Sequence, residues 1–108
     1  MVLGVLISSS GKIYEGEWVH GKKAGYGTEK SVDGHIYIGQ SAEGKPNGHG
    51  TFRWVDGDTY EGEFVNGIKH GKGVWKNTAG ASYNGEWVDG QAEGFGIHIW
   101  ENGKNFKL

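Results

Sequence analysis

The chain has 108 residues, enough for one domain, and a formal net charge of −2 at pH 7, with 11 basic residues spread along the sequence rather than gathered into a nucleic-acid surface. It contains no Cys, so neither a disulfide framework nor a Cys-based zinc site can form. Its 5 Trp, 5 Tyr and 4 Phe are too many aromatic residues for a disordered polar chain.

An apolar run, MVLGVLI, occupies residues 1–7. The run lacks the charged start and the small-residue cleavage site of a signal peptide, and it is far too short to span a bilayer. We therefore predict that it forms a β-strand.

From Tyr14 onward the sequence repeats with a period of 23 residues, without gap or insertion. The four copies occupy residues 14–36, 37–59, 60–82 and 83–105, with a half copy before them at 1–13 and a stub after them at 106–108. Every copy has Gly at its positions 3, 8, 12, 14 and 21, and these positions account for 20 of the 22 glycines. A flexible linker would scatter its glycines, so the pattern indicates a single repeat domain over residues 1–108.

Each copy predicts two strands, as the third copy illustrates. Residues 60–64 (YEGEF) read aromatic, polar, Gly, polar, aromatic. This alternation is typical of a half-buried strand. A second strand begins near Gly71 and runs to Lys76, and Asn66-Gly67 between the two suits a tight hairpin turn. Because helical spacing of apolar residues appears nowhere, we predict an all-β fold. It would be one elongated, twisted antiparallel meander of stacked hairpins, with about nine strands spanning roughly 40 Å.

The turn between copies sets the register between neighbouring hairpins. If residues 55–57 (VDG) form a three-residue loop with Gly57 in the left-handed conformation, aromatic residues lie opposite one another and large rings lie over bare glycines. The predicted cross-strand pairs are Phe52 with Tyr60, Gly50 with Gly62, Gly48 with Phe64, Trp75 with Tyr83, and Gly71 with Trp87.

This register places 12 of the 14 aromatic residues on one face, which we call the aromatic face, and leaves Tyr26 and Phe95 on the other. The aromatic face consists of Tyr14, Trp18, Tyr37, Phe52, Trp54, Tyr60, Phe64, Trp75, Tyr83, Trp87, Trp100 and Phe106. The opposite face is predicted to be charged, through Glu15, Glu17, Lys30, Arg53, Glu61, Glu63, Lys76 and Glu86. A single-layer sheet has no second layer to cover the rings, and large exposed apolar patches usually mark interaction sites. We therefore expect the aromatic face to be both core and binding groove, with a purely structural core as the alternative.

No catalytic arrangement is recognisable in the sequence. The five histidines occupy five different positions of the repeat without a recurring ligand spacing, so no metal site is predicted. Gly-x-Gly occurs in every copy, but no strand-to-helix transition follows it, which argues against a dinucleotide site. The acidic residues around Asp56 and Glu61 resemble a calcium loop in one dimension, whereas strand alternation directs them apart. We expect no enzymatic activity and no cofactor.

The combination of Tyr-x-Gly-x-Trp/Phe, Asn/Asp-Gly, Gly-x-Gly and Asp-Gly, repeated every 23 residues, resembles the membrane occupation and recognition nexus (MORN) repeat. The resemblance covers nearly the whole chain. It implies an elongated, twisted sheet of stacked hairpins with an aromatic-lined groove, acting as a non-enzymatic module for protein–protein contact. It also implies a scaffold role in the cytoplasm, at cytoskeletal, ciliary or membrane-junction structures.

We predict that a peptide or helix of a partner protein binds in this groove. The predicted groove residues are Phe52, Trp54, Tyr60, Phe64, Trp75, Tyr83 and Trp87. The copies are unequal, because Glu29, Ser31 and Ser41 stand where other copies have rings, and this polar gap is a candidate determinant of specificity.

Two alternatives to partner binding remain open. The first is self-assembly through unpaired edge strands, as an end-to-end homodimer or a rod. The second is binding of phospholipid headgroups, although the net charge of −2 weakens the electrostatic attraction to an anionic membrane. The lysines expected to contact lipid are Lys22, Lys23, Lys69 and Lys72.

Overall fold

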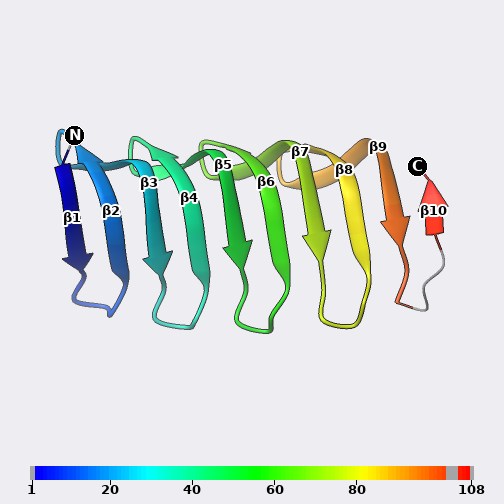
Figure 1. Cartoon of the computed structure of the whole chain (residues 1–108), viewed down its shortest axis with the longest axis horizontal. Helices are drawn as coiled ribbons and strands as arrows, with labels where there is room; N and C mark the ends of the chain where they lie inside the picture. The colour runs from blue at the N-terminus through cyan, green and yellow to red at the C-terminus, as the bar shows by residue number, and fades with distance from the viewer. Residues whose placement is uncertain (1, 102–104, 108) are drawn as a thin grey trace.

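The structure is a computed structural model that describes residues 2–101 and 105–107. These residues form a single ten-stranded antiparallel sheet in which every strand pairs with its neighbours in chain order (Figure 1). The strands are β1 (Val2–Ile7), β2 (Ile13–Val19), β3 (Lys22–Lys30), β4 (Ile36–Ala42), β5 (Lys45–Arg53), β6 (Thr59–Val65), β7 (Ile68–Lys76), β8 (Ser82–Val88), β9 (Gln91–Ile99) and β10 (Asn105–Lys107). The predicted fold is confirmed, with ten strands rather than about nine because β10 pairs with β9. The longest axis measures 46 Å.

Two kinds of turn alternate along the sheet, and both follow from the sequence. Within a copy, Asn66 (φ 51°) and Gly67 (φ 84°) form the two-residue turn whose positive φ angles match the twist of antiparallel strands. The equivalent turns are His20-Gly21, Glu43-Gly44 and Asp89-Gly90. Between copies, Gly57 adopts φ 98° and the Trp54 amide donates to the Asp58 carbonyl at 2.9 Å, closing the predicted three-residue loop. All five predicted cross-strand pairs are confirmed.

A bulge interrupts the hairpin within each of the four copies, beside the first glycine of the Gly-x-Gly pair. In the third copy the pairing shifts between Gly62 and Phe64, and Gly71 at this point has φ 88°. Glu63 Oε2 accepts a hydrogen bond of 2.8 Å from the Lys72 amide and fills the space that a side chain at Gly71 would occupy. The equivalent acceptors in the first two copies are Glu17 and Gln40. The side chain at this position, Glu17, Gln40 or Glu63, therefore stabilises the bend through a hydrogen bond and is more than a surface charge.

A tyrosine ring covers the second glycine of each pair. Tyr60 lies across Gly73, where any Cβ would overlap the phenol, and its hydroxyl donates to the Glu63 carbonyl at 3.0 Å. Tyr14, Tyr37 and Tyr83 make the same bond to the carbonyls of Glu17, Gln40 and Glu86. The prediction that a ring lies over Gly71 is wrong, because Glu63 fills that space, and Gly48 likewise meets an amide side chain instead of a ring.

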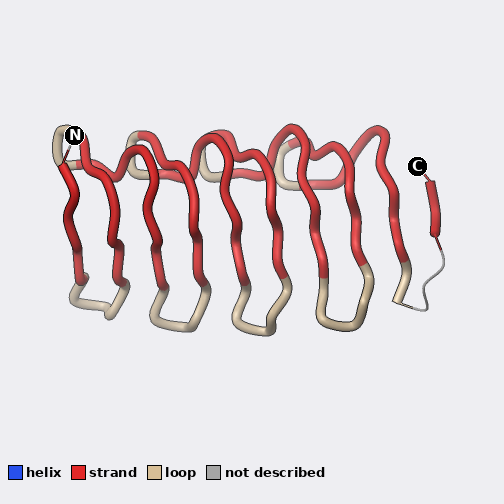
Figure 2. Tube along the Cα trace, in the orientation of Figure 1, coloured by secondary structure: helices blue, strands red, loops and turns tan. Residues whose placement is uncertain are grey.

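The hairpin tips form a second row beside the main part of the sheet. The Gly67 amide donates to the Pro46 carbonyl at 2.7 Å, and the Gly90 amide donates to the Lys69 carbonyl at 2.9 Å, so each of these tips is tied to the preceding copy. Figure 2 shows the upper parts of the strands bending and the tips following one another along the sheet. Gly67, Gly90 and Lys69 share a hollow with Phe52 of the aromatic face. The tips thus cover part of that face, and the expectation that nothing covers it is wrong for its deepest rings.

A row of interlocked rings forms the core. Phe64 stands edge-on between Tyr37 and Tyr60, at centroid distances of 5.4 and 5.2 Å. Trp87 stands in the same way between Tyr60 and Tyr83, at 5.2 and 5.4 Å. Tyr60 at the centre of the row is fully buried. Each such edge-to-face pair adds about 0.5–1.5 kcal/mol beyond the burial of apolar area, so neighbouring copies stabilise one another.

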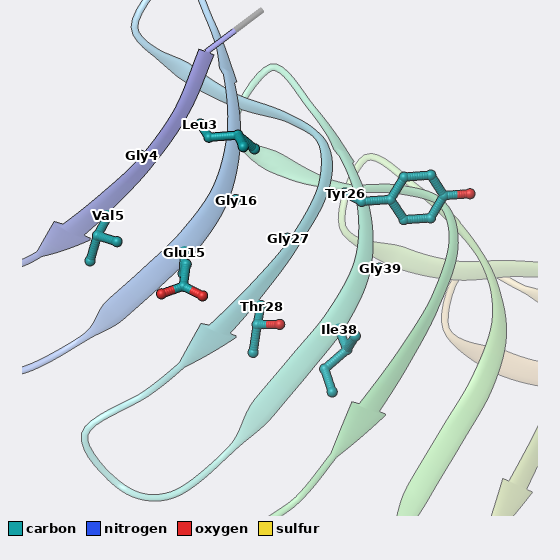
Figure 3. A pocket seen from close by; sticks show the side chains of 10 residues that line it. All are labelled: Leu3, Gly4, Val5, Glu15, Gly16, Tyr26, Gly27, Thr28, Ile38 and Gly39. Atoms are coloured by element: carbon teal, nitrogen blue, oxygen red, sulfur yellow. The ribbon is translucent and has the colours of Figure 1, made fainter.

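The opposite face is less uniformly charged than predicted. Leu3, Val5, Tyr26 and Ile38 line a shallow hollow of about 570 Å³ near the N-terminal end (Figure 3). Phe95, nearer the C-terminal end, is 80% exposed. One reason is that position 2 of the repeat, which is Glu61 in the third copy, is Ile38 in the second. Likewise, position 13 is Lys72 in the third copy but is Leu3, Tyr26 and Phe95 in the half copy, the first copy and the fourth copy. Within the described residues, no helix is long and apolar enough to cross a membrane.

Alkaline pH should unfold the sheet through its buried phenols. Burial, with a smaller contribution from nearby carboxylates, raises the pKa of Tyr37 and of Tyr60 from the ordinary value of 10.0 to about 12. Below pH 10 these phenols are neutral in both states and their stabilisation is complete. Between pH 10 and 12 the unfolded chain ionises first, so the stabilisation is lost.

We expect the free energy of unfolding, measured by urea titration with circular dichroism, to fall across that pH range. Tyr26→Phe, at a ring that is 61% exposed, should leave the profile unchanged. If the free energy of unfolding instead stayed constant up to about pH 12, these phenols would not be buried as described.

Alanine in place of the ring-covered glycine should be costly. Gly73→Ala forces its methyl group into the Tyr60 phenol, and we expect a loss of about 2–3 kcal/mol in the free energy of unfolding. Gly4→Ala is the matched control, since Gly4 occupies the same position of the half copy. A Cβ there meets only the Trp18 side chain, at 3.1 Å, so the loss should be smaller. Equal losses in urea titrations of the two variants would contradict the packing described.

Candidate functional site

A cleft of about 260 Å³ opens in the middle of the aromatic face. It lies between the end of β5, the strand β6 and two successive hairpin tips. Its lining residues, which define what we call the aromatic cleft, are Phe52, Trp54, Phe64, Gly67, Ile68, Lys69 and Gly90. The rings of Phe52 and Trp54 contact each other at a centroid distance of 4.7 Å and form one wall. The tips form the other wall.

The predicted groove residues fall into two groups. Four of them are buried in the core: Tyr60, Phe64, Tyr83 and Trp87. The other three, Phe52, Trp54 and Trp75, are partly exposed and pack against that core. Phe52 and Trp54 line the aromatic cleft together with Phe64, whereas Trp75 lines a separate hollow with His98 and Trp100. The structure therefore brings together only part of the predicted groove as an accessible surface.

Lys69 lies among the rings of the cleft. Its Nζ is 4.7 Å from the ring centroid of Trp87, 5.3 Å from that of Trp54 and 5.6 Å from that of Tyr60. Ammonium groups at such distances are attracted by the negative ring faces, most strongly where water is excluded. Burial lowers the pKa of Lys69. Among the described residues, no hydrogen-bonding or ion-pair partner of this ammonium is found.

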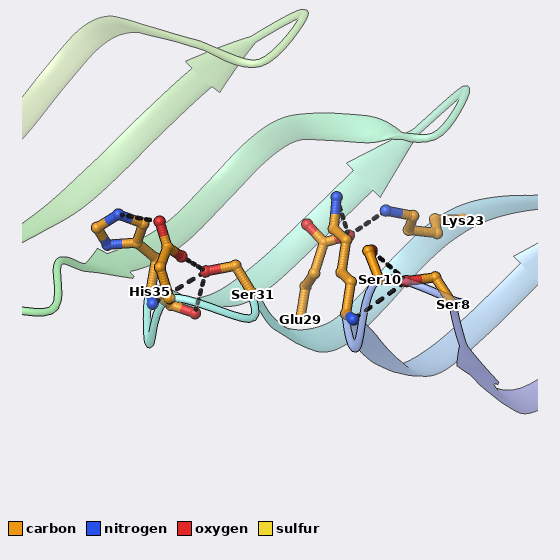
Figure 4. A network of polar contacts seen from close by, with 8 residues as sticks. Ser8, Ser10, Lys23, Glu29, Ser31 and His35 are labelled. Carbon is orange, nitrogen blue, oxygen red and sulfur yellow. Dashed lines mark hydrogen bonds and ion pairs between the residues drawn. The ribbon is translucent and has the colours of Figure 1, made fainter.

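The polar gap in the N-terminal third is occupied by an ion-pair network. Ser41 stands at the position of Phe64 and Trp87 and is buried. Lys23 pairs with Glu29, which also pairs with Lys12 at 3.3 Å (Figure 4). The Lys23 Nζ lies 5.4 Å from the Tyr14 ring centroid.

Ser31, the remaining predicted gap residue, belongs to the neighbouring turn. Its Oγ accepts a hydrogen bond of 3.0 Å from the His35 amide. Glu29 and Ser31 line a hollow of about 180 Å³ with Lys12, His35, Tyr37 and Phe52. This polar hollow adjoins the aromatic cleft through Phe52, which lines both.

The four lysines expected to contact lipid do not form one patch. Lys22 pairs with Glu43 at 3.0 Å, and Lys23 pairs with Glu29. Lys69 lies against the cleft rings, and Lys72 lines a hollow with Phe95 on the opposite face. A membrane surface could not contact all four at once.

The sequence pattern and the sheet agree with one known repeat. The sequence model of the MORN repeat matches residues 14–36, 37–59, 60–81 and 83–104. The chain belongs to the MORN repeat family. No curated protein matches its sequence. MORN repeats are non-enzymatic modules that generally mediate protein or membrane interactions.

Within residues 2–101 and 105–107, no group of three or more His, Asp or Glu side chains could hold a metal ion.

Sequence reasoning missed the place of Lys69 in the MORN sheet, although a signal was present. The two-residue turn Asn66-Gly67 pairs Val65 with Ile68 and therefore Phe64 with Lys69, which puts this lysine on the aromatic face. The contacts of Lys69 with rings of the preceding and following MORN copies could not be read from the pattern, because they depend on the bend at the bulge.

Removal of one carboxylate should test the polar gap. The side chains of Lys23 and Glu29 are only 19% and 18% exposed, so Glu29→Gln leaves a half-buried ammonium without its anion. We expect a loss of about 1–3 kcal/mol in the free energy of unfolding, measured by urea titration. Glu43→Gln breaks the Lys22 pair, whose side chains are 60% and 83% exposed, and should have little effect. Similar effects of the two changes would show that the polar gap is not a stabilising network.

Proposed function

We propose that this MORN chain is a non-enzymatic interaction module that binds a segment of a partner protein in the aromatic cleft. The observation that supports this is the placement of partly exposed rings, Phe52 and Trp54, around a hollow in an otherwise ring-filled face. Aromatic anchors around a desolvated pocket are typical of the residues that dominate protein–protein affinity.

The size of the cleft favours a side chain over a small-molecule ligand. Its volume of about 260 Å³ lies below the roughly 300–1,000 Å³ of typical small-molecule sites. The walls are also held in place before binding, since Trp54 packs against Phe52 and the tip at Gly67 is bonded to Pro46. A preformed site loses less conformational entropy on association.

The buried rings are unsuitable for testing this proposal, because alanine at Phe64 or Trp87 would unfold the core. Trp54→Ala removes one of the two rings in the cleft wall, and Trp54 is not one of the buried core residues. Peptides selected from a displayed random library on the wild-type chain should lose at least about tenfold in affinity on Trp54→Ala, as expected for an aromatic anchor. Tyr26→Ala, on the opposite face, is the control and should bind normally. If the selected peptides bind Trp54→Ala as tightly as wild type, the cleft is not their site.

Self-association is a second candidate, and the apolar surface of β1 favours it. Val2 is 67% exposed, Leu3 79% and Ile7 68%, in a strand without a charged residue. Exposed apolar strands of this kind favour pairing with another chain. Sedimentation velocity at two protein concentrations should show a concentration-dependent species that Leu3→Lys abolishes. A monomer at both concentrations would exclude it.

A further inference from the structure

Lys69 is the one charged residue among the seven that line the aromatic cleft. Its Nζ lies over the rings of Trp54, Tyr60 and Trp87 but meets no carboxylate among the described residues. A half-buried ammonium that is neither hydrated in full nor paired is costly. Ring faces offset this cost only in part, because they do not accept the hydrogen bonds that a carboxylate would accept.

The first copy shows how the same repeat position is satisfied elsewhere in this chain. Lys23 and Lys69 both occupy position 10 of their copies, and each lies over the tyrosine at position 1, at 5.4 and 5.6 Å. Lys23 has an anion, because Glu29 at position 16 of its own copy reaches it. At position 16 the third copy has Trp75, so no carboxylate reaches Lys69 from the equivalent place.

The surroundings of this ammonium are otherwise apolar. The other side chains that line the cleft are those of Phe52, Trp54, Phe64 and Ile68, all of them apolar. The two remaining copies have Pro46 and Ala92 at position 10, so the combination of a half-buried lysine, an adjoining cleft and no internal anion occurs once among the four copies.

We propose that the partner segment recognised by the aromatic cleft is an acidic–apolar one, in which an Asp or Glu carboxylate pairs with Lys69 and a neighbouring apolar side chain enters the cleft against Phe52 and Trp54. The incoming carboxylate provides the ion-pair partner for Lys69 that Glu29 provides for Lys23. This inference rests on the proposed function and specifies the chemistry of its ligand. Charge provides selectivity here, because a basic or purely apolar segment leaves the ammonium unpaired.

The test begins with the displayed-peptide selection on the full chain, using peptides with blocked termini so that the only carboxylates are side chains. Peptides whose binding depends on Trp54 should be enriched in Asp or Glu close to Leu, Ile, Phe or Trp. Lys69→Met keeps the unbranched stem and removes the charge, and it should weaken these peptides about tenfold, as does loss of a hydrogen bond to a charged group. Changing the peptide's acidic residue to its amide should cause a similar loss, and the two changes together should add little more.

Lys72→Met is the matched control, since Lys72 lies in the same strand, β7, but is exposed and lines a hollow on the opposite face. It should leave affinity unchanged. Circular dichroism and urea midpoints of both lysine variants establish that the sheet is intact, so a loss of binding by Lys69→Met cannot come from unfolding.

The outcomes separate the inference from the proposed function. Peptides that require Trp54 but show no acidic enrichment, or bind Lys69→Met as well as wild type, overturn the inference and leave the cleft as a binding site. A selection that yields no peptide dependent on Trp54 contradicts the proposed function and the inference with it. Binding to phosphatidylserine vesicles that is lost in Lys69→Met, with no such binding to acidic peptides, would assign the ammonium to a lipid phosphate and likewise overturn the inference.

Discussion

The contact between a tyrosine ring and two bare glycines determines the rest of this MORN sheet. Tyr60 lies flat across the strands because neither Gly62 nor Gly73 has a Cβ, and its hydroxyl bonds a carbonyl of its own strand. Phe64 and Trp87 both pack edge-to-face with this fully buried ring, at interplanar angles of 80° and 86°. The second, third and fourth copies therefore pack their rings against one another, the nearest-neighbour stabilisation typical of repeat proteins.

The first glycine of each pair has a different task, which is to let the hairpin bend. At Gly71 the positive φ and the Glu63 carboxylate together hold a bulge, and beyond it the tip turns toward the aromatic face. The hairpin tips thereby cover part of the core, and the described part of the chain contains neither a second sheet nor a helix. The same bend brings Lys69 over the rings and leaves the cleft beside Trp54.

Departures from the repeat give this uniform scaffold one distinctive region. In the second copy Ser41 replaces a ring, and the Lys23–Glu29 pair lies in the same part of the sheet. In the third copy the equivalent lysine, Lys69, has rings around it but no carboxylate among the residues that the structure describes. The polar hollow and the aromatic cleft adjoin at Phe52, which lines both. A ligand that extended across both would meet the charged side chains of the hollow and the rings of the cleft.

The sequence by itself determined the period, the strands, both turn types and the pairing of Phe52 with Tyr60 and of Trp75 with Tyr83. These follow from alternation and from the φ angles that Asn-Gly and Asp-Gly turns require, which are properties of residues close together in the chain. Only the tertiary structure decided that Glu63 fills the space at Gly71, that the tips cover the deepest rings, and that Phe52 and Trp54 stay accessible while Phe64 does not. These outcomes depend on the direction in which each bulge bends the strand and on contacts between residues of different copies, which a one-dimensional pattern does not contain.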